Sequence, residues 1–186
     1  LTGLADRFGR TQTFHRDADG EFAGEITAVT DGAGRRFRLV LTTQAQRAAQ
    51  YRKQTAAAGT KHLPFPDTLP ATAYGTDNGL RLAEVWLTHD PEYPDILPAA
   101  PLARYDYSPR GELATVYDRS GTAVRHFTYD PPHPGRMTAH QYAGRPQTTY
   151  RYDAAGRVVA QHNPAGLSYT RTAASCIITA MITSTG

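Results

Sequence analysis

The sequence has 186 residues, a formal net charge of +3 at pH 7 and a hydrophobic content of 40%. It holds no run of about 18 apolar residues, which excludes a membrane-spanning helix, and its single cysteine excludes an internal disulfide. All but two of its 20 basic residues are arginines spread singly along the chain, whereas nucleic-acid-binding proteins cluster such residues on one face, so no nucleic-acid partner is expected.

Residues 1–42 are expected to form β-hairpins joined by glycine turns. Gly24 and Gly34 lie ten residues apart, and Ile26 follows the first of them by two positions. The stretch "DRFGR" at 6–10 has the spacing of the turn "DAAGR" at 153–157. Glycine permits the positive φ that such tight turns need.

Residues 43–79 interrupt this pattern and predict a loop or low-order insertion. The segment "TTQAQRAAQYRKQTAAAGTKH" is rich in Ala and Gln, which leaves a short helix and a mobile loop as alternatives. The segment "LPFPDTLPATAYGTDNG" then carries three prolines, which remove backbone donors. The whole stretch is too poor in apolar residues to bury a core of its own, so it is interpreted as an insertion within a repeat array.

Alternating residues return at 80–90, where "LRLAEVWLTHD" predicts a strand whose alternation slips near Val85. The connection "PEYPDILPAAP" has four prolines and is expected to be a loop. A second strand from Leu102 to Tyr107 is expected to pair with the first.

A unit of about 22 residues then repeats through the rest of residues 80–169. Each copy has a tyrosine, a turn glycine and a second glycine nine or ten residues later. The aspartates are expected to accept hydrogen bonds from the backbone two residues on. The tyrosines favour packing between hairpins, with a stacking platform for sugars as the alternative. The residues assigned to this repeat are Tyr107, Gly111, Gly121, Tyr129, Asp130, Gly135, Gly144, Tyr152, Asp153, Gly156 and Gly166.

Residues 170–186, "TRTAASCIITAMITSTG", depart from the pattern as an aberrant C-terminal tail. They carry no charge after Arg171, no aromatic residue and no turn glycine before the last position. The run from Cys176 to Ile182 is typical of an aggregation-prone strand.

These motifs resemble those of the Rhs family, whose hallmark is the tyrosine-aspartate (YD) repeat. The similarity extends over about residues 1–169 and includes the blocks "VTDGAGRRFRLVLTTQAQRA", "FPDTLP", "VWLTHDPEYPDILPAAPLARY", "FTYDPPHPGRM" and "NPAGLSY". It implies an all-β fold in which antiparallel YD-repeat hairpins form a curved open sheet, a partial arc of the family's β-shell, with a long irregular insertion.

The family's shell encloses a C-terminal toxin and is joined to a type VI secretion spike. Neither a toxin domain nor the family's self-cleavage motif has a counterpart here, so the resemblance is to an internal core fragment of an enterobacterial Rhs protein. The departure at residue 170 suggests a truncated or frame-shifted gene.

No enzyme activity, cofactor or metal site is expected, because the sequence lacks the GxSxG, HExxH, P-loop and CxxC patterns. Histidines seven residues apart on strands alternate between faces. Three alternatives remain. The first is a metal site at His126, His133 and His140, and the second is a cation site in the loop with His89, Asp90, Glu92 and Asp95. The third is Cys176 as a nucleophile, for which no activating base is evident.

Three functions remain open at this point. The first is a non-enzymatic structural fragment of a shell that, in full-length relatives, encapsulates and delivers a toxin in interbacterial competition. Its partners would be other YD repeats, a toxin domain or secretion-spike proteins. The second is a carbohydrate- or surface-binding module, and the third is a gene remnant without present function. The chain is expected to be cytoplasmic, with export only through a dedicated secretion system.

Overall fold

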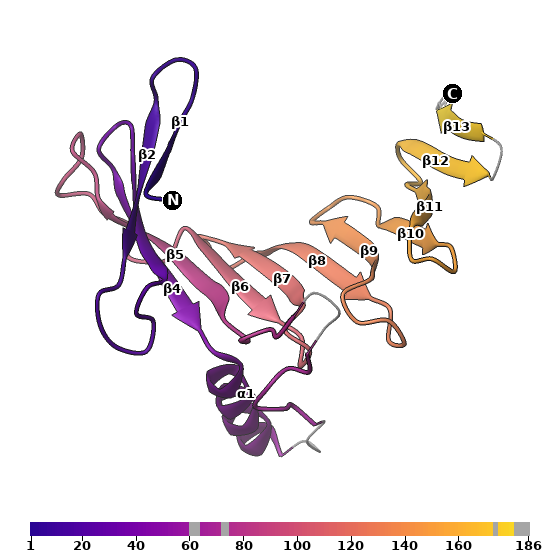
Figure 1. Ribbon diagram of the computed structural model, residues 1–186, viewed down its shortest axis with the longest axis horizontal. Helices are drawn as coiled ribbons and strands as arrows, with labels where there is room; N and C mark the ends of the chain where they lie inside the picture. The colour runs from indigo at the N-terminus through magenta and orange to yellow at the C-terminus, as the bar shows by residue number, and fades with distance from the viewer. Residues whose placement is uncertain (60–63, 72–74, 173–174, 181–186) are drawn as a thin grey trace. The chain divides into compact units, whose positions relative to one another are not determined.

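The computed structural model describes residues 1–59, 64–71, 75–172 and 175–180. Figure 1 shows its elements, which are β1 (Gly3–Ala5), β2 (Thr11–Arg16), β3 (Ile26–Asp31), β4 (Arg36–Thr42), α1 (Gln44–Ala58), β5 (Arg81–His89), β6 (Ala103–Tyr107), β7 (Leu113–Asp118), β8 (Ala123–Tyr129), β9 (Met137–Tyr142), β10 (Thr148–Tyr152), β11 (Val158–His162), β12 (Leu167–Thr172) and β13 (Ser175–Ala180). In the part of the chain covered by these ranges, no helix is both long and apolar enough to cross a membrane.

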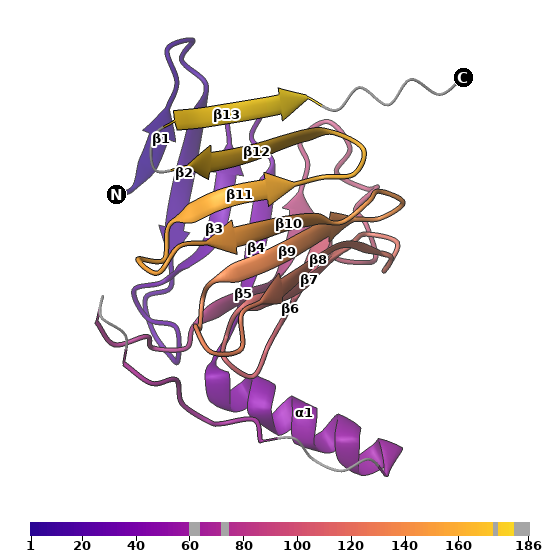
Figure 2. The ribbon, with the colours of Figure 1, turned by 90° about the vertical axis from the view of Figure 1, so that its right-hand side faces the viewer.

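The strands follow one another in the sheet in sequence order, from β1 to β13. Neighbouring strands run antiparallel, as in β2–β3, β4–β5 and β8–β9. Figure 2 shows the later strands, β9 to β13, as successive rungs of this ladder. The expected all-β fold of antiparallel hairpins in one open sheet is therefore confirmed.

The chain divides into two compact units. One consists of Leu1–Gly111 with Tyr117–Thr122, and the other of Glu112–Val116 with Ala123–Gly186. The helix and strands β1 to β6 lie in the first unit, and strands β8 to β13 lie in the second.

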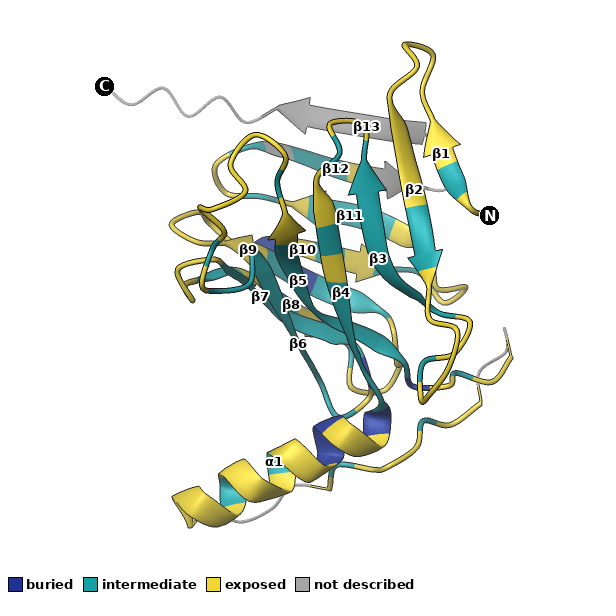
Figure 3. Ribbon diagram, turned by 90° about the vertical axis from the view of Figure 1, so that its left-hand side faces the viewer, coloured by how far each residue is buried: buried dark blue, intermediate teal, exposed yellow. Residues whose placement is uncertain are grey.

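Most strand side chains are half-buried rather than enclosed (Figure 3). Among the described residues, Ala48 and Ala139 are the buried hydrophobic ones. Gln44, Arg47 and Thr148 are buried polar ones, and none of the large side chains in the described part of the chain is fully buried. Since hydrophobic stabilisation scales with the apolar area removed from water, this sheet relies on ladder hydrogen bonds and partial burial more than on a dry core.

Helix α1 decides between the two alternatives left open for residues 44–58. Ala and Gln favour a helix, and its first turn is closed by a capping box. The Thr43 hydroxyl accepts from the Gln46 amide at 3.2 Å, and the Gln46 side chain accepts from the Thr43 amide at 3.0 Å. At the other end Gly59 has φ 64°. The insertion is thus not irregular throughout; residues 60–63 and 72–74 within it lie outside the described residues.

Replacing Thr43 with alanine is expected to destabilise α1 by about 1 kcal/mol, the usual cost of losing a helix N-cap. The change opens the capping box but leaves the buried residues of the first turn in place. The loss of stability would be measured by following the helical circular dichroism signal during a urea titration. A Thr43→Ser variant, which keeps the hydroxyl, should unfold close to the parent, and equal losses in both variants would contradict the capping role.

The slip of alternation near Val85 corresponds to a bulge in the β4–β5 pairing. Val40 pairs with Glu84 and Leu41 with Leu82, so Ala83 is the extra residue. An extra residue shifts every following side chain to the other face. The expected second strand is also present, because Arg104 of β6 pairs with Glu84 of β5.

The run predicted as a strand from Cys176 to Ile182 falls partly on β13, whose backbone pairs with β12 from Thr172↔Ser175 to Leu167↔Ala180. Residues 181–186 lie outside the described part.

Candidate functional site

Turns of one recurring geometry join strands in both units. In the β3–β4 turn, Asp31 Oδ1 accepts from the amides of Ala33 and Arg35, both at 3.0 Å, and Oδ2 accepts from Arg35 Nε at 2.8 Å. The Gly34 amide donates to the Asp31 carbonyl at 3.0 Å, with Gly34 at φ 79°. One carboxylate therefore holds both the backbone and the side chain that close the turn.

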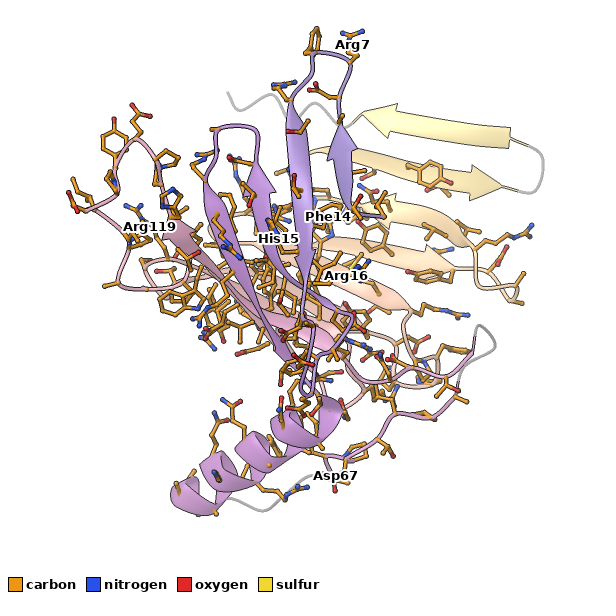
Figure 4. The ribbon with its side chains drawn as sticks, turned by 60° about the vertical axis from the view of Figure 1, so that its left-hand side comes forward. Arg7, Phe14, His15, Arg16, Asp67 and Arg119 are labelled. Carbon is orange, nitrogen blue, oxygen red and sulfur yellow. The ribbon has the colours of Figure 1, made fainter. Side chains whose placement is uncertain are left out.

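The same arrangement recurs at Asp6 and Asp153, each with an arginine four positions on. Asp118 keeps the backbone contacts with Thr122 in the arginine's place and adds the Ser120 hydroxyl at 2.6 Å. Figure 4 shows Arg7 at the tip of the first of these turns, where its guanidinium lies 4.6 Å from the Phe8 ring centroid.

These contacts lower the pKa of the turn carboxylates. At Asp31 the hydrogen bond from the Arg35 side chain holds the pKa below its ordinary value of 3.8, assisted by the amides of Arg35 and Ala33. At Asp153 the Arg157 amide lowers the pKa first, followed by the Arg157 side chain and the Ala155 amide. The Ser120 hydroxyl has the same effect on the pKa of Asp118.

Acid is therefore expected to weaken the folded state through these turns. A folded-state pKa below the unfolded value stabilises the fold at pH above the unfolded value, and that contribution is lost as pH falls through the folded value. The urea concentration at the midpoint of unfolding should accordingly decrease as the pH is lowered from about 5 to about 2.

An Asp31→Asn variant should be less stable near neutral pH and show a shallower acid dependence. Asp19→Asn, an exposed change outside these turns, serves as the control. Parallel pH profiles for Asp31→Asn and the parent would contradict the role of the turn.

The glycines of the expected repeat lie in turns with one difference among them. Five have positive φ, between 69° and 79°: Gly111, Gly121, Gly135, Gly144 and Gly156. Gly166 does not, although its amide donates to the Asn163 carbonyl at 3.2 Å. The left-handed region is therefore not what requires glycine at 166.

The two aspartates of the expected repeat also differ. Asp153 accepts from the Arg157 amide at 2.9 Å, four residues on, and the Ala155 amide, two residues on, helps to lower its pKa. Asp130 has no such donor two residues on, because residue 132 is a proline and has no N–H. Its carboxylate instead lies 2.8 Å from His133 Nδ1.

The tyrosines contact neighbouring strands. The Tyr107 hydroxyl donates to the Leu82 carbonyl of β5 at 2.7 Å, and the Tyr152 hydroxyl donates to the Met137 carbonyl of β9 at 2.5 Å. The Arg136 guanidinium lies 5.0 Å from the Tyr152 ring centroid. Burial raises the pKa of Tyr129, and the Glu112 carboxylate adds to this. These contacts are of the kind that packing between hairpins produces.

A buried polar cluster, the Arg47 hub, was not predicted from the sequence. It consists of Gln44 and Arg47 on the first turns of α1 and their backbone partners. Arg47 donates to the carbonyls of Thr42 at 3.0 Å and Gly79 at 2.8 Å, and to the Gln44 side chain at 2.7 Å. Gln44 donates to the carbonyls of Pro66 at 3.0 Å and Pro109 at 2.8 Å. Helix, proline-rich segment and strand ends are thus tied at one point.

Asp77 and Arg81 border the hub. Arg81 donates to both Asp77 oxygens and, through Nε, to the Gly111 carbonyl at 2.8 Å. The Arg81 hydrogen bond holds the pKa of Asp77 below its usual value, whereas burial, followed by repulsion from Arg81, lowers the pKa of Arg47. The Thr43–Gln46 capping spacing just ahead of Arg47 signals the start of the helix in the sequence, but not the burial of Gln44 and Arg47.

The histidines named as an alternative metal site do not share one face of the sheet. Because Phe127 pairs with His140, its neighbour His126 lies on the opposite face from His140. His140 stacks on Tyr150 with centroids 5.7 Å apart. Among the described residues, no group of three or more His, Cys, Asp or Glu side chains is placed to bind a metal ion. The Cys176 side chain lies outside the described set.

Comparison with known proteins finds a family match and a similar toxin protein. A profile of the RHS Repeat family matches residues 135–168. The toxin protein Tse5 of Pseudomonas aeruginosa is 38% identical over 103 residues, which is 50% of this chain and 8% of Tse5. The chain therefore spans less than a tenth of that relative.

Solved structures are also similar, and two of them are described here. They are a crystal structure of TcdB2-TccC3 and the Photorhabdus luminescens Tc holotoxin pore, each with a TM-score of 0.46 and 16% identity. The matches cover 84% and 95% of this chain and 6% and 9% of those chains, respectively.

Proposed function

Because this chain belongs to the Rhs family of YD-repeat proteins, we propose that it is a non-enzymatic structural part of a repeat shell that encloses and delivers a toxin in competition between bacteria. Its direct partners are then further YD repeats and the enclosed toxin polypeptide. Components of a secretion spike would be partners during export.

The observation that carries this proposal is the sheet itself. It is built of successive hairpins, and most of the side chains on its strands are half-buried. A self-sufficient domain of this length buries a sizeable apolar core, whereas the described residues bury two alanines. Such a sheet suits a wall that continues into further repeats. The toxin relative supports the toxin part of the proposal.

An exchange of segments tests the proposal. The matching 103 residues of the Pseudomonas aeruginosa toxin are replaced by those of this chain, and the product's resistance to trypsin and its toxicity to sensitive cells are measured. A non-repeat segment of equal length is the control. A protease-resistant, toxic chimera supports the proposal. A soluble, folded chimera as protease-sensitive and harmless as the control would overturn it.

The chain purified by itself is expected to self-associate, because β1 and β13 end the strand order and edge strands offer unpaired N–H and C=O groups. Sedimentation velocity over a concentration series should show assemblies that grow with concentration. A single monomeric species with a sharp, cooperative thermal transition would contradict this expectation.

A further inference from the structure

One of the two asparagines in the chain, Asn78, is followed directly by glycine. Asparagine deamidates when the next backbone nitrogen attacks its side-chain carbonyl carbon, and a following glycine favours this attack because it has no Cβ to obstruct it. Asn78 is exposed, whereas Gly79 is buried. The other asparagine, Asn163, precedes Pro164, which has no N–H. The chain therefore offers a reactive asparagine together with an unreactive one.

The attacking nitrogen has a base beside it. The Gly79 amide donates to Asp77 Oδ1 at 2.8 Å, within the reach of about 2.6–3.2 Å that a general base needs. Arg81 donates to both oxygens of this carboxylate and holds the pKa of Asp77 below its ordinary value. Asp77 is thus ionised at neutral pH, and although a carboxylate of lowered pKa is a weak base, it is fixed on the proton that must leave.

The carbonyl oxygen of the Asn78 side chain has a donor of its own. The Leu80 amide donates to Asn78 Oδ1 at 3.0 Å. When a nucleophile adds to a carboxamide carbon, negative charge develops on this oxygen, and a fixed N–H stabilises it in the manner of an oxyanion hole. Nucleophile, base and oxyanion donor are therefore all supplied by residues 77–80.

We propose that Asn78 deamidates in the folded chain by a reaction that its own neighbours promote. The Gly79 nitrogen attacks Asn78 Cγ and forms an N–Cγ bond, while Asp77 takes the amide proton. The Cγ–Nδ2 bond then breaks, and Nδ2 leaves as ammonia with that proton. Water opens the resulting succinimide at either carbonyl, which gives the aspartyl or the isoaspartyl form of residue 78. This self-modification is separate from the shell role proposed above, and neither depends on the other.

The reaction product affects the Arg47 hub. In the isoaspartyl form the main chain between residues 78 and 79 contains an additional carbon atom. The Gly79 carbonyl accepts from Arg47 at 2.8 Å, and a Cβ placed on Gly79 would lie 2.7 Å from Gln44 Cβ. The loop is thus too close to the helix to absorb the extension in place. The isoaspartyl form is expected to release the start of α1, so the reaction limits how long the helix stays docked.

The test compares the full chain at neutral pH in its folded state and unfolded in guanidinium chloride. Mass spectrometry of peptides follows the mass increase that the exchange of NH2 for OH produces at Asn78. We expect the folded chain to react about tenfold faster, because the reacting groups are already in place. The peptide with Asn163 is the control for modification during handling. A folded chain that reacts no faster than the unfolded chain would overturn the proposal.

Variants separate the base from the mobility of the loop. Asp77→Ala removes both the base and the partner of Arg81, whereas Arg81→Gln loosens the same loop and keeps the base. We expect Asn78 to react about tenfold more slowly in Asp77→Ala and no more slowly than the parent in Arg81→Gln. Circular dichroism verifies folding of each variant. A folded Asp77→Ala variant that reacts as fast as the parent or faster would overturn the proposal. If that variant does not fold, the comparison of folded and unfolded parent chains still decides.

Discussion

Replacing Arg47 with methionine will release helix α1 from the sheet and leave the strands of the first unit paired. Methionine fills much of the same space but makes none of the three hydrogen bonds that Arg47 donates to Thr42, Gln44 and Gly79. A hydrogen bond to a charged group contributes about 1.5–3 kcal/mol. Part of this is recovered because a buried charge is removed, so we expect a net loss of about 3 kcal/mol in the docking of α1.

Hydrogen exchange resolves this effect from global unfolding. Amides of Gln44–Ala58 should exchange much faster in Arg47→Met, whereas those of β3 and β4 should keep their protection, because local openings need not involve the whole sheet. Arg52→Ala is the matched control on the same helix. Arg52 pairs with Asp67 at 2.9 Å, with both side chains at least half-exposed, and such surface pairs contribute little. Unchanged protection of α1 in Arg47→Met would show that the hub does not hold the helix.

The contrast between the Asp–Gly turns and the Arg47 hub shows which parts of this fold can be predicted from the sequence. An Asp–Gly turn is decided within five residues, since the carboxylate of Asp153 reaches only as far as Arg157. Its spacing therefore repeats visibly along the chain. Where the pattern failed, at Asp130, the cause was equally local, because a proline occupies the donor position.

The hub has no comparable signature. Gln44 bonds to Pro109, which lies 65 positions away, and Arg47 bonds to Gly79, 32 positions away. Gln and Arg on an Ala-rich segment ordinarily indicate a solvent-exposed helix face. Only the close approach of three chain segments makes them buried, and a single sequence carries no record of that approach.

Replacing Gly79 with alanine is the second change expected to have a large effect, and it acts on the same contact. Gly79 has φ 72°, and an added Cβ would lie 2.7 Å from Gln44 Cβ, an atom next to the helix backbone. The left-handed conformation costs alanine about 1 kcal/mol relative to glycine, and overpacking adds about 1–3 kcal/mol. We expect a loss of about 3 kcal/mol in urea unfolding. Gly121→Ala has a similar φ of 78° with nothing within 4 Å of the added Cβ, so it should lose only about 1 kcal/mol.

The double variant Arg47→Met, Gly79→Ala tests whether the two residues act on one structural element. If the clash at Gly79 displaces the start of α1, the contacts of Arg47 are already broken in Gly79→Ala, and the second change has little left to remove. The combined loss should then fall short of the sum by about 1 kcal/mol or more, as expected for residues in one network. Additive losses would instead mean that the alanine introduced at position 79 strains only its own loop and leaves the helix docked. Gly79 and Arg47 would then act independently.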